Sequence, residues 1–161
     1  MTTQRLELDR FVPYRLSVLA NLVSRAFALL YAERFDIAIP EWRVLAVLGM
    51  AEPQSASEVC ERTAMDKVRV SRAVQSLLAS GLVERGISAD DRRRASLTLT
   101  RRGKAIYGEI VPLARSVETS LMETLTVEEA SQLDVLLTKL QLRADELSSP
   151  AGVGINASPN D

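Results

Sequence analysis

A short run of basic and polar side chains carries the most distinctive chemistry in this sequence. The run spans residues 67–75 and contains Lys67, Arg69, Ser71, Arg72 and Gln75. Lysine and arginine pair with O6 and N7 of guanine, and glutamine can pair with adenine, so this set can read base edges in the major groove of DNA. The same side-chain types also bind phosphates, and the sequence alone does not divide the five between the two tasks.

A second basic group, Arg92-Arg93-Arg94, follows further along the chain. It lies in a polar stretch, residues 86–94, between two segments that can extend as strands. A strand, a basic loop and a strand predict a hairpin with an exposed, positively charged tip. Such a tip suits the minor groove of DNA, where the negative potential favours arginine.

The charge of the chain is concentrated in the segment that holds both groups. The whole chain carries 20 Lys and Arg against 21 Asp and Glu, and this net charge of −1 by itself argues against a nucleic-acid partner. Residues 62–104, however, carry a net charge of +7, which leaves −8 for the rest of the chain. Because such asymmetry concentrates a positive potential on one part of a surface, it favours DNA binding over a solvated charge run.

The composition excludes several kinds of active site. The chain has no histidine, so catalytic triads, dyads and metal sites that need an imidazole are ruled out. It also lacks a glycine-rich phosphate loop, and acidic pairs such as Asp90-Asp91 and Glu128-Glu129 suit a loop and a helix cap. We therefore expect no enzymatic activity and no cofactor.

The sequence shows neither a membrane-spanning run nor a signal peptide. The chain has no uninterrupted run of eighteen apolar residues, and its acidic start lacks the apolar region of a signal peptide. Its single cysteine cannot form a disulfide within the chain. We expect a cytoplasmic protein without a membrane partner.

Hydrophobic periodicity predicts the elements that position these groups. Helices are expected over about 11–35, 41–51, 55–62, 67–80, 100–124 and 127–147, and strands over 82–85 and 95–99. Capping boxes are predicted at Ser55 and Thr126, which open the third and the last helix. Asp66 suits the N-cap of the fourth helix, and Gly81 suits the left-handed position after its end. Two short helices joined by a tight turn and followed by a basic hairpin form a winged helix-turn-helix. The predicted fold class is therefore mainly α with a small β wing.

The order of these motifs resembles the MarR (multiple antibiotic resistance regulator) family. The family's wing signature, Asp-x-Arg followed by a strand that closes in Leu-Thr, is matched by residues 91–100. Residues 58–72 are similar to its helix-turn-helix, and residues 77–85 to its exit into the wing. The resemblance covers about residues 16–147. It implies that Arg93 enters the minor groove and that Asp91 holds the wing in place.

The resemblance also implies a homodimer formed through the first and last helices. The residues agree with a dimer, because both ends carry more apolar surface than a small winged core needs: Leu16, Leu19, Val23, Leu30, Leu133, Leu137 and Leu140. A dimer places two recognition helices about 34 Å apart and predicts a pseudo-palindromic operator. The expected function is a sequence-specific regulator of transcription, a repressor that a small effector releases.

Candidate effector residues are the cations and the tryptophan near the first two helices. Arg15, Arg25 and Arg43 need partners if they lie near an apolar interface, and these are either internal acids such as Glu33 or Glu41, or an anionic ligand. Trp42 suits the core between the first two helices, and the alternative is that it lines an effector pocket. Members of this family often bind small aromatic acids or their thioesters, and the resemblance implies a ligand of this kind for this chain.

Two alternatives to an effector-released repressor remain open. A winged helix can also dock a protein instead of DNA, although such docking does not require the basic bias. Cys60 can be a regulatory thiol, as in some relatives, but a mid-helix position favours a small buried residue.

The predicted domain organisation is a single MarR-like domain over residues 1–147. The winged-helix region spans about 36–104, and dimerisation helices span about 9–35 and 105–147. Residues 148–161 are rich in Ser, Pro, Gly and Asn and are predicted to form a disordered tail.

Overall fold

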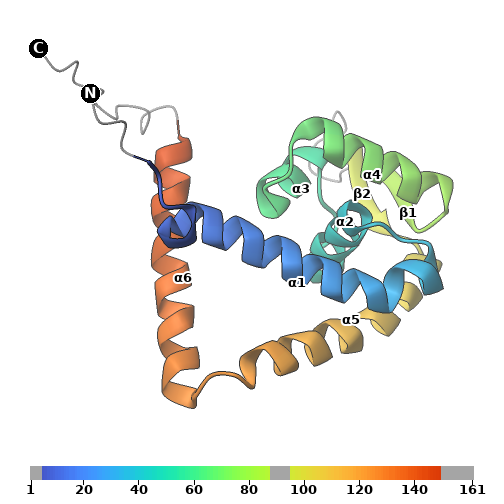
Figure 1. The fold of residues 1–161 in the computed structure, drawn as a ribbon. Helices are drawn as coiled ribbons and strands as arrows, with labels where there is room; N and C mark the ends of the chain where they lie inside the picture. The colour runs from blue at the N-terminus through green and yellow to red at the C-terminus, as the bar shows by residue number, and fades with distance from the viewer. Residues whose placement is uncertain (1–4, 88–94, 150–161) are drawn as a thin grey trace, which may run out of the picture. The chain divides into compact units, whose positions relative to one another are not determined.

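The computed structural model describes residues 5–87 and 95–149. Its elements, in chain order, are the 3-10 helix η1 (Leu8–Arg10), α1 (Val12–Phe35), α2 (Ile39–Met50), α3 (Ala56–Thr63), α4 (Lys67–Ala79), β1 (Val83–Ile87), β2 (Ala95–Leu99), α5 (Arg101–Met122) and α6 (Val127–Ser148) (Figure 1). The mainly helical fold with a two-stranded antiparallel wing is the predicted class. Each predicted helix and strand ends within two residues of its observed bounds, and only η1 was not predicted.

The chain divides into two compact units, residues 1–117 and 118–161, with the boundary inside α5. The first unit contains the winged helix-turn-helix and the core. The second unit contains α6, of which no residue is buried. The expected disordered tail lies almost wholly outside the described residues, and α6 continues to Ser148.

The core of the first unit joins the helix-turn-helix to the wing. Its largest fully buried side chains come from α1, α2, α3, α4 and α5: Tyr31, Val44, Leu45, Leu48, Val59, Val70, Leu77 and Ile110. Leu97 and Leu99 of β2 add the apolar residues of the wing. Burial of these residues holds α4 against α2 and α3, and this packing decides which side of α4 stays in solvent.

Local hydrogen bonds define both ends of α3 and α4. Ser55 and Glu58 form a capping box at the start of α3, with the Ser55 amide donating to the Glu58 carboxylate at 2.6 Å. At the end of α4, Gly81 has φ of +68°. The Leu82 amide donates to the Leu77 carbonyl and the Gly81 amide to that of Leu78, which is the Schellman pattern of a glycine-terminated helix. These ends confirm the predicted cap sites.

The wing is anchored to the helices at its base. Val83 pairs with Leu99 and Arg85 with Leu97 in the antiparallel ladder. The segment before α3 adds a bridge, because the amides of Gln54 and Leu97 each donate to the other's carbonyl at 3.1 and 2.7 Å. The base of the wing is therefore tied to the loop that leads into α3.

Helix α1 is long and apolar enough to cross a membrane by length and composition alone. The sequence had predicted no such segment, because charged residues interrupt its apolar run. Only 11% of its most apolar window is buried within the chain. A helix whose apolar side packs on a second protein chain passes the same test of length and composition.

Candidate nucleic-acid interface

Helix α4 buries one apolar side and leaves its polar side chains in solvent. Its buried residues, Val70, Ala73, Val74 and Leu77, pack into the core. The five predicted DNA-binding side chains are all exposed: Lys67, Arg69, Ser71, Arg72 and Gln75. The structure therefore leaves all five in solvent, with Arg72 and Gln75 opposite the buried residues and the other three on the flanks.

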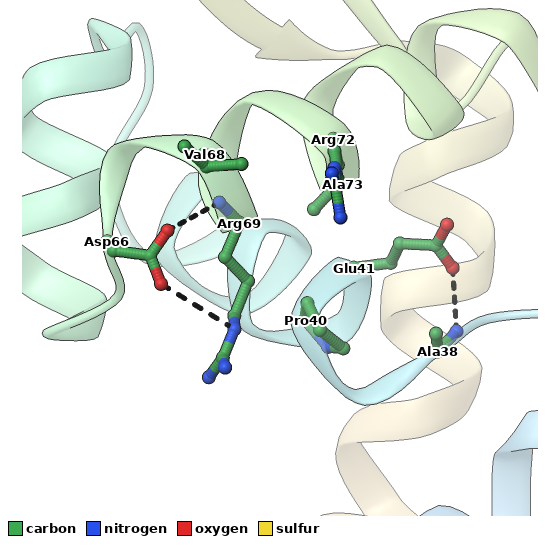
Figure 2. Close-up of a pocket in the computed structure, with 8 residues that line it drawn as sticks. All are labelled: Ala38, Pro40, Glu41, Asp66, Val68, Arg69, Arg72 and Ala73. Atoms are coloured by element: carbon green, nitrogen blue, oxygen red, sulfur yellow. Dashed lines mark hydrogen bonds and ion pairs between the residues drawn. The ribbon is translucent and has the colours of Figure 1, made fainter.

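The first turn of α4 is held by Asp66. Its carboxylate accepts the backbone amide of Arg69 at 2.8 Å, and its other oxygen lies 3.9 Å from Arg69 Nε (Figure 2). The amide hydrogen bond is the main reason that the pKa of Asp66 lies below its ordinary value of 3.8, and the Arg69 charge lowers it further. Asp66 therefore stays ionised at neutral pH and orients Arg69 at the start of the helix.

One flank of α4 forms a shallow pocket with α3 and β1. Lys67 and Ser71 line this pocket of about 260 Å³ together with Ser57 and Arg85. Hydroxyl and cationic groups of this kind bind phosphate. Ser57 and Arg85 were not predicted from the sequence, and strand alternation alone places Arg85 on the same side as the buried Val83.

Cys60 lies in the same pocket. Its side chain is partly buried against the core and partly exposed to the pocket. The prediction of a small buried residue is therefore only partly correct. The thiol borders the groove that Lys67 and Arg85 line.

The first turns of α4 also face the start of α2. Arg69, Arg72 and Val68 line a pocket of about 430 Å³ with Pro40 and Glu41 (Figure 2). The Glu41 carboxylate is used within α2, where it accepts the Ala38 amide at 2.6 Å. Asp66 also lines this pocket and pairs with Arg69, so the pocket holds two arginines beside two carboxylates.

A neighbouring pocket of about 270 Å³ brings together three arginines. Arg25 of α1, Arg43 of α2 and Arg69 of α4 line it, with Asn21 and Ser24. The structure thus places two of the four predicted effector residues, Arg25 and Arg43, in one site, and adds Arg69, which was assigned to DNA alone. The sequence could not connect α1 to α4, because that contact depends on how the helices pack.

The predicted internal acids do not neutralise these arginines in the part of the chain described. Arg43 donates to Ser24 Oγ at 3.4 Å. Within residues 5–87 and 95–149, neither Glu33 nor Glu41 forms an ion pair with Arg15, Arg25 or Arg43. In the described part of the chain these two acids are therefore not the partners of the arginines, and an anionic ligand stays a prediction.

The remaining predicted effector residues lie elsewhere. Arg15 is exposed on α1, about 15 Å along the helix axis from Arg25. Trp42 lies in an aromatic cluster, with its ring centroid 5.4 Å from Phe27 and 6.0 Å from Tyr107. Neither residue lines the three-arginine pocket, and Trp42 packs against the core as the first of its two predicted roles requires.

The predicted wing-tip residues Asp91, Arg92, Arg93 and Arg94 lie outside the described residues. Their roles therefore remain predictions from the sequence. The described base of the wing ends at Ile87 and resumes at Ala95.

Comparisons with known proteins agree with this geometry. A family model described as the MarR family matches residues 35–94, which include the helix-turn-helix. The chain is 30% identical over 145 residues to the HTH-type transcriptional regulator TtmR of Methylorubrum extorquens, and the match covers 90% of this chain and 71% of that protein.

Solved structures show the same fold. The MarR/EmrR family transcriptional regulator from Acinetobacter sp. ADP1 matches with a TM-score of 0.81 and 29% identity, over 88% of this chain and 99% of that one. A mutant MarR from E. coli in complex with operator DNA matches with a TM-score of 0.71 and 25% identity, over 85% of this chain and 99% of that one. These relatives are regulators of transcription and not enzymes. Together with the exposed polar side of α4, the matches establish that the chain belongs to the MarR family of DNA-binding transcriptional regulators.

Proposed function

We propose that this protein is a homodimeric, cytoplasmic repressor that reads a pseudo-palindromic operator and is released by a small anionic effector. The observation that carries the proposal is the exposed polar side of α4, where five hydrogen-bonding side chains face solvent opposite four buried ones. Occupation of an operator by a protein is most simply a steric block to transcription, and this is the reason for proposing repression.

The position of each α4 side chain around the helix supports a division between base contacts and phosphate contacts. Successive residues of a helix are rotated by about 100°. On that geometry Arg72 and Gln75 lie within about 30° of the direction directly opposite the buried residues, whereas Lys67, Arg69 and Ser71 lie on the flanks. We assign Arg72 and Gln75 to base edges and the flanking three to phosphates. The wing arginines Arg92, Arg93 and Arg94 are assigned to the minor groove, with Asp91 supporting them.

Exposed apolar surface on α1 and α6 supports a homodimer. All but Val23 of the seven apolar residues that the sequence selected for dimerisation are exposed in the single chain. Leu29 is 83% exposed and Val127 is 82% exposed. A second copy that buried these side chains would gain about 25 cal/mol for each Å² of apolar area removed from water. A twofold pairing would also give the two recognition helices that a pseudo-palindromic operator needs.

The three-arginine pocket supports an anionic effector. A carboxylate in this pocket can accept paired hydrogen bonds from Arg25 and Arg43 in the manner typical of guanidinium groups. Arg69 contributes to the same pocket and to α4, so an effector that binds Arg69 competes with its DNA contact. Such a ligand prefers the state that does not bind DNA, which is the condition for release.

Operator binding is tested on DNA selected from a random duplex pool by the full chain. Affinity should fall steeply as salt is raised, because cations on α4 and the wing displace counterions. Arg72→Ala should cost roughly 10-fold or more and relax the preference for one base pair, whereas Lys67→Ala should weaken all sequences alike and lower the salt slope by about one. If Arg72→Ala and Lys67→Ala behave identically, the assignment of bases and phosphates is wrong.

Dimerisation is tested by light scattering on the purified chain. The expected mass is twice 17.7 kDa. Leu140→Glu should give the mass of one chain, because it places a carboxylate in the proposed interface, and Lys139→Glu, an exposed neighbour, serves as the control. A single-chain mass for the unaltered protein would contradict the homodimer.

Effector binding is tested with benzoate and related aromatic carboxylates. A ligand that binds the native state raises the melting temperature in proportion to its saturation. Arg43→Gln should abolish the rise and the release of DNA, whereas Arg15→Gln should change neither, because Arg15 lies outside the pocket. An equal response in both variants would exclude this pocket as the effector site.

A further inference from the structure

Helix α4 carries one apolar side chain that its packing does not explain. Val68 is 61% exposed, whereas Val70, Ala73, Val74 and Leu77 of the same helix are buried. Within α4, all of which is described, Val68 is the only valine or leucine that is exposed. A single exposed valine is ordinary on a protein surface. This one, however, lies on the side of α4 that is proposed to face DNA.

Val68 lies at the centre of the DNA-facing side. At about 100° per residue, it lies within about 10° of the direction directly opposite the four buried residues. It is flanked on that side by Gln75 and Arg72, which are rotated from it by about 20° and 40° in opposite directions. Arg72 also lies one helical turn after Val68 and lines the same pocket.

This position is unusual for an apolar group in a basic segment. The neighbouring side chains Lys67 and Arg69 are cationic, and a polar residue at position 68 would keep the whole side hydrated. When α4 enters the major groove, its central residues meet base edges and its flanks meet phosphates. Valine donates and accepts no hydrogen bond, so the only base-edge group with which it makes a favourable contact is the C5-methyl of thymine.

We propose that Val68 determines specificity by packing its methyl groups against the C5-methyl group of a thymine in the operator. The proposal rests on the proposed insertion of α4 into the major groove and deepens it by naming a base. Val68 and Arg72 are separated by about 6 Å along the helix axis, which is about two base-pair steps of duplex DNA. The thymine therefore lies within about two base pairs of the base contacted by Arg72.

The contact has a defined expected size. Removing one methyl group from an apolar contact weakens binding by about fourfold. An operator in which the thymine is replaced by deoxyuridine keeps its base pairing and loses only that methyl group. The unaltered protein should bind this DNA about fourfold more weakly for each half-site changed.

The test is a double-mutant cycle between protein and DNA. Each thymine of the selected operator is replaced in turn by deoxyuridine, and the dissociation constant is measured for the full chain and for Val68→Ala. The substitution to alanine is made at an exposed helical position, so circular dichroism should show an unchanged fold. Met50→Ala, which alters an apolar residue of α2 that is 75% exposed, is the matched control.

The expected result is one thymine in each half-site whose methyl group contributes about fourfold with the unaltered protein and with Met50→Ala, and nothing with Val68→Ala. The proposal is overturned if no thymine shows this effect, or if the effect persists in full with Val68→Ala. If the unaltered protein shows no sequence-selective binding at all, the proposed insertion of α4 into the major groove is overturned instead.

Discussion

The ammonium group of Lys104 lies 2.5 Å from Oε1 of Glu52, while Oε2 of the same carboxylate accepts the backbone amide of Leu99 at 2.8 Å. Glu52 belongs to the loop between α2 and α3, Leu99 closes β2 and Lys104 lies in the first turn of α5. One carboxylate thus connects the helix-turn-helix, the base of the wing and the helix that follows it. The wing is held at a defined place beside α4 by this link and by the Gln54–Leu97 bridge.

The Glu52 link should make stability depend on pH. Burial alone would raise the pKa of Glu52, but the hydrogen bonds from Lys104 and from the Leu99 amide outweigh burial and hold the pKa below its ordinary value of 4.5. A carboxylate with a lowered pKa in the folded state stabilises the protein above about pH 4.5, and this contribution is lost as the pH falls through the folded value.

Urea unfolding of Glu52→Gln measures this contribution. We expect the variant to be less stable than the unaltered chain at pH 7, by up to about 1 kcal/mol because the pair is partly exposed, and the difference to vanish in acid. Lys104→Met is the partner variant, and in its background the effect of Glu52→Gln should be smaller. A difference that is constant from pH 7 to pH 3 would contradict the role of the ionised carboxylate.

Gly103 should tolerate no side chain. A Cβ atom at this position would overlap the carbonyl oxygen of Leu82, which accepts the Thr100 amide at 3.0 Å. We expect Gly103→Ala to lower the free energy of unfolding by about 1–3 kcal/mol, since the backbone of the wing must move. Gly108, in the same helix, has nothing within 4 Å of an added Cβ, so Gly108→Ala should stabilise by about 0.5–1 kcal/mol. Thermal unfolding of both variants should give shifts of opposite sign.

Tyr31 should be replaceable by phenylalanine without loss of stability. Its side chain is fully buried, and its hydroxyl has no hydrogen-bond partner among the described residues. Its ring packs on Phe27 with centroids 4.7 Å apart, a contact that phenylalanine keeps. Because an unsatisfied buried hydroxyl costs free energy, Tyr31→Phe should raise the stability by about 1 kcal/mol at pH 7.

Ionisation of Tyr31 should also change the stability of the protein at alkaline pH. Burial raises the pKa of Tyr31 to about 12, with Glu41 adding to the shift and Arg43 opposing it. Below pH 10 the phenol is neutral in both the folded and the unfolded chain, so its ionisation does not change the free energy of unfolding. Between pH 10 and about 12 the phenol ionises only in the unfolded chain, and the free energy of unfolding therefore falls. The unaltered chain should therefore lose more stability than Tyr31→Phe over this interval. Parallel losses would show that the phenol ionises as readily in the folded state.

Charge reversal at the wing tip should weaken DNA binding strongly. Arg93→Glu places a carboxylate where the sequence predicts a minor-groove arginine, and the negative potential of the groove opposes it. We expect a loss of at least 10-fold in operator affinity, with a smaller salt slope, measured by fluorescence anisotropy. Arg115→Glu, an exposed change on α5, is the control for net charge. An unchanged affinity for Arg93→Glu would show that the wing tip does not touch DNA.

The sequence by itself determined the elements and the chemistry of the DNA-binding segment. Helix ends were predictable because Ser55, Asp66, Thr126 and Gly81 act on their own neighbouring backbone, so their effect is local. The five polar residues of α4 and the +7 segment were predictable for the same reason, because both depend only on the order of residues within one continuous segment.

Only the tertiary structure decided which of these residues share a site. The three-arginine pocket joins positions 25, 43 and 69, and no local pattern connects them, because their proximity depends on the packing of α1, α2 and α4. The division of α4 into a central and two flanking sets depends on which side the core buries. That burial leaves Val68 in solvent, although its residue type suits a core as well as Val70 does.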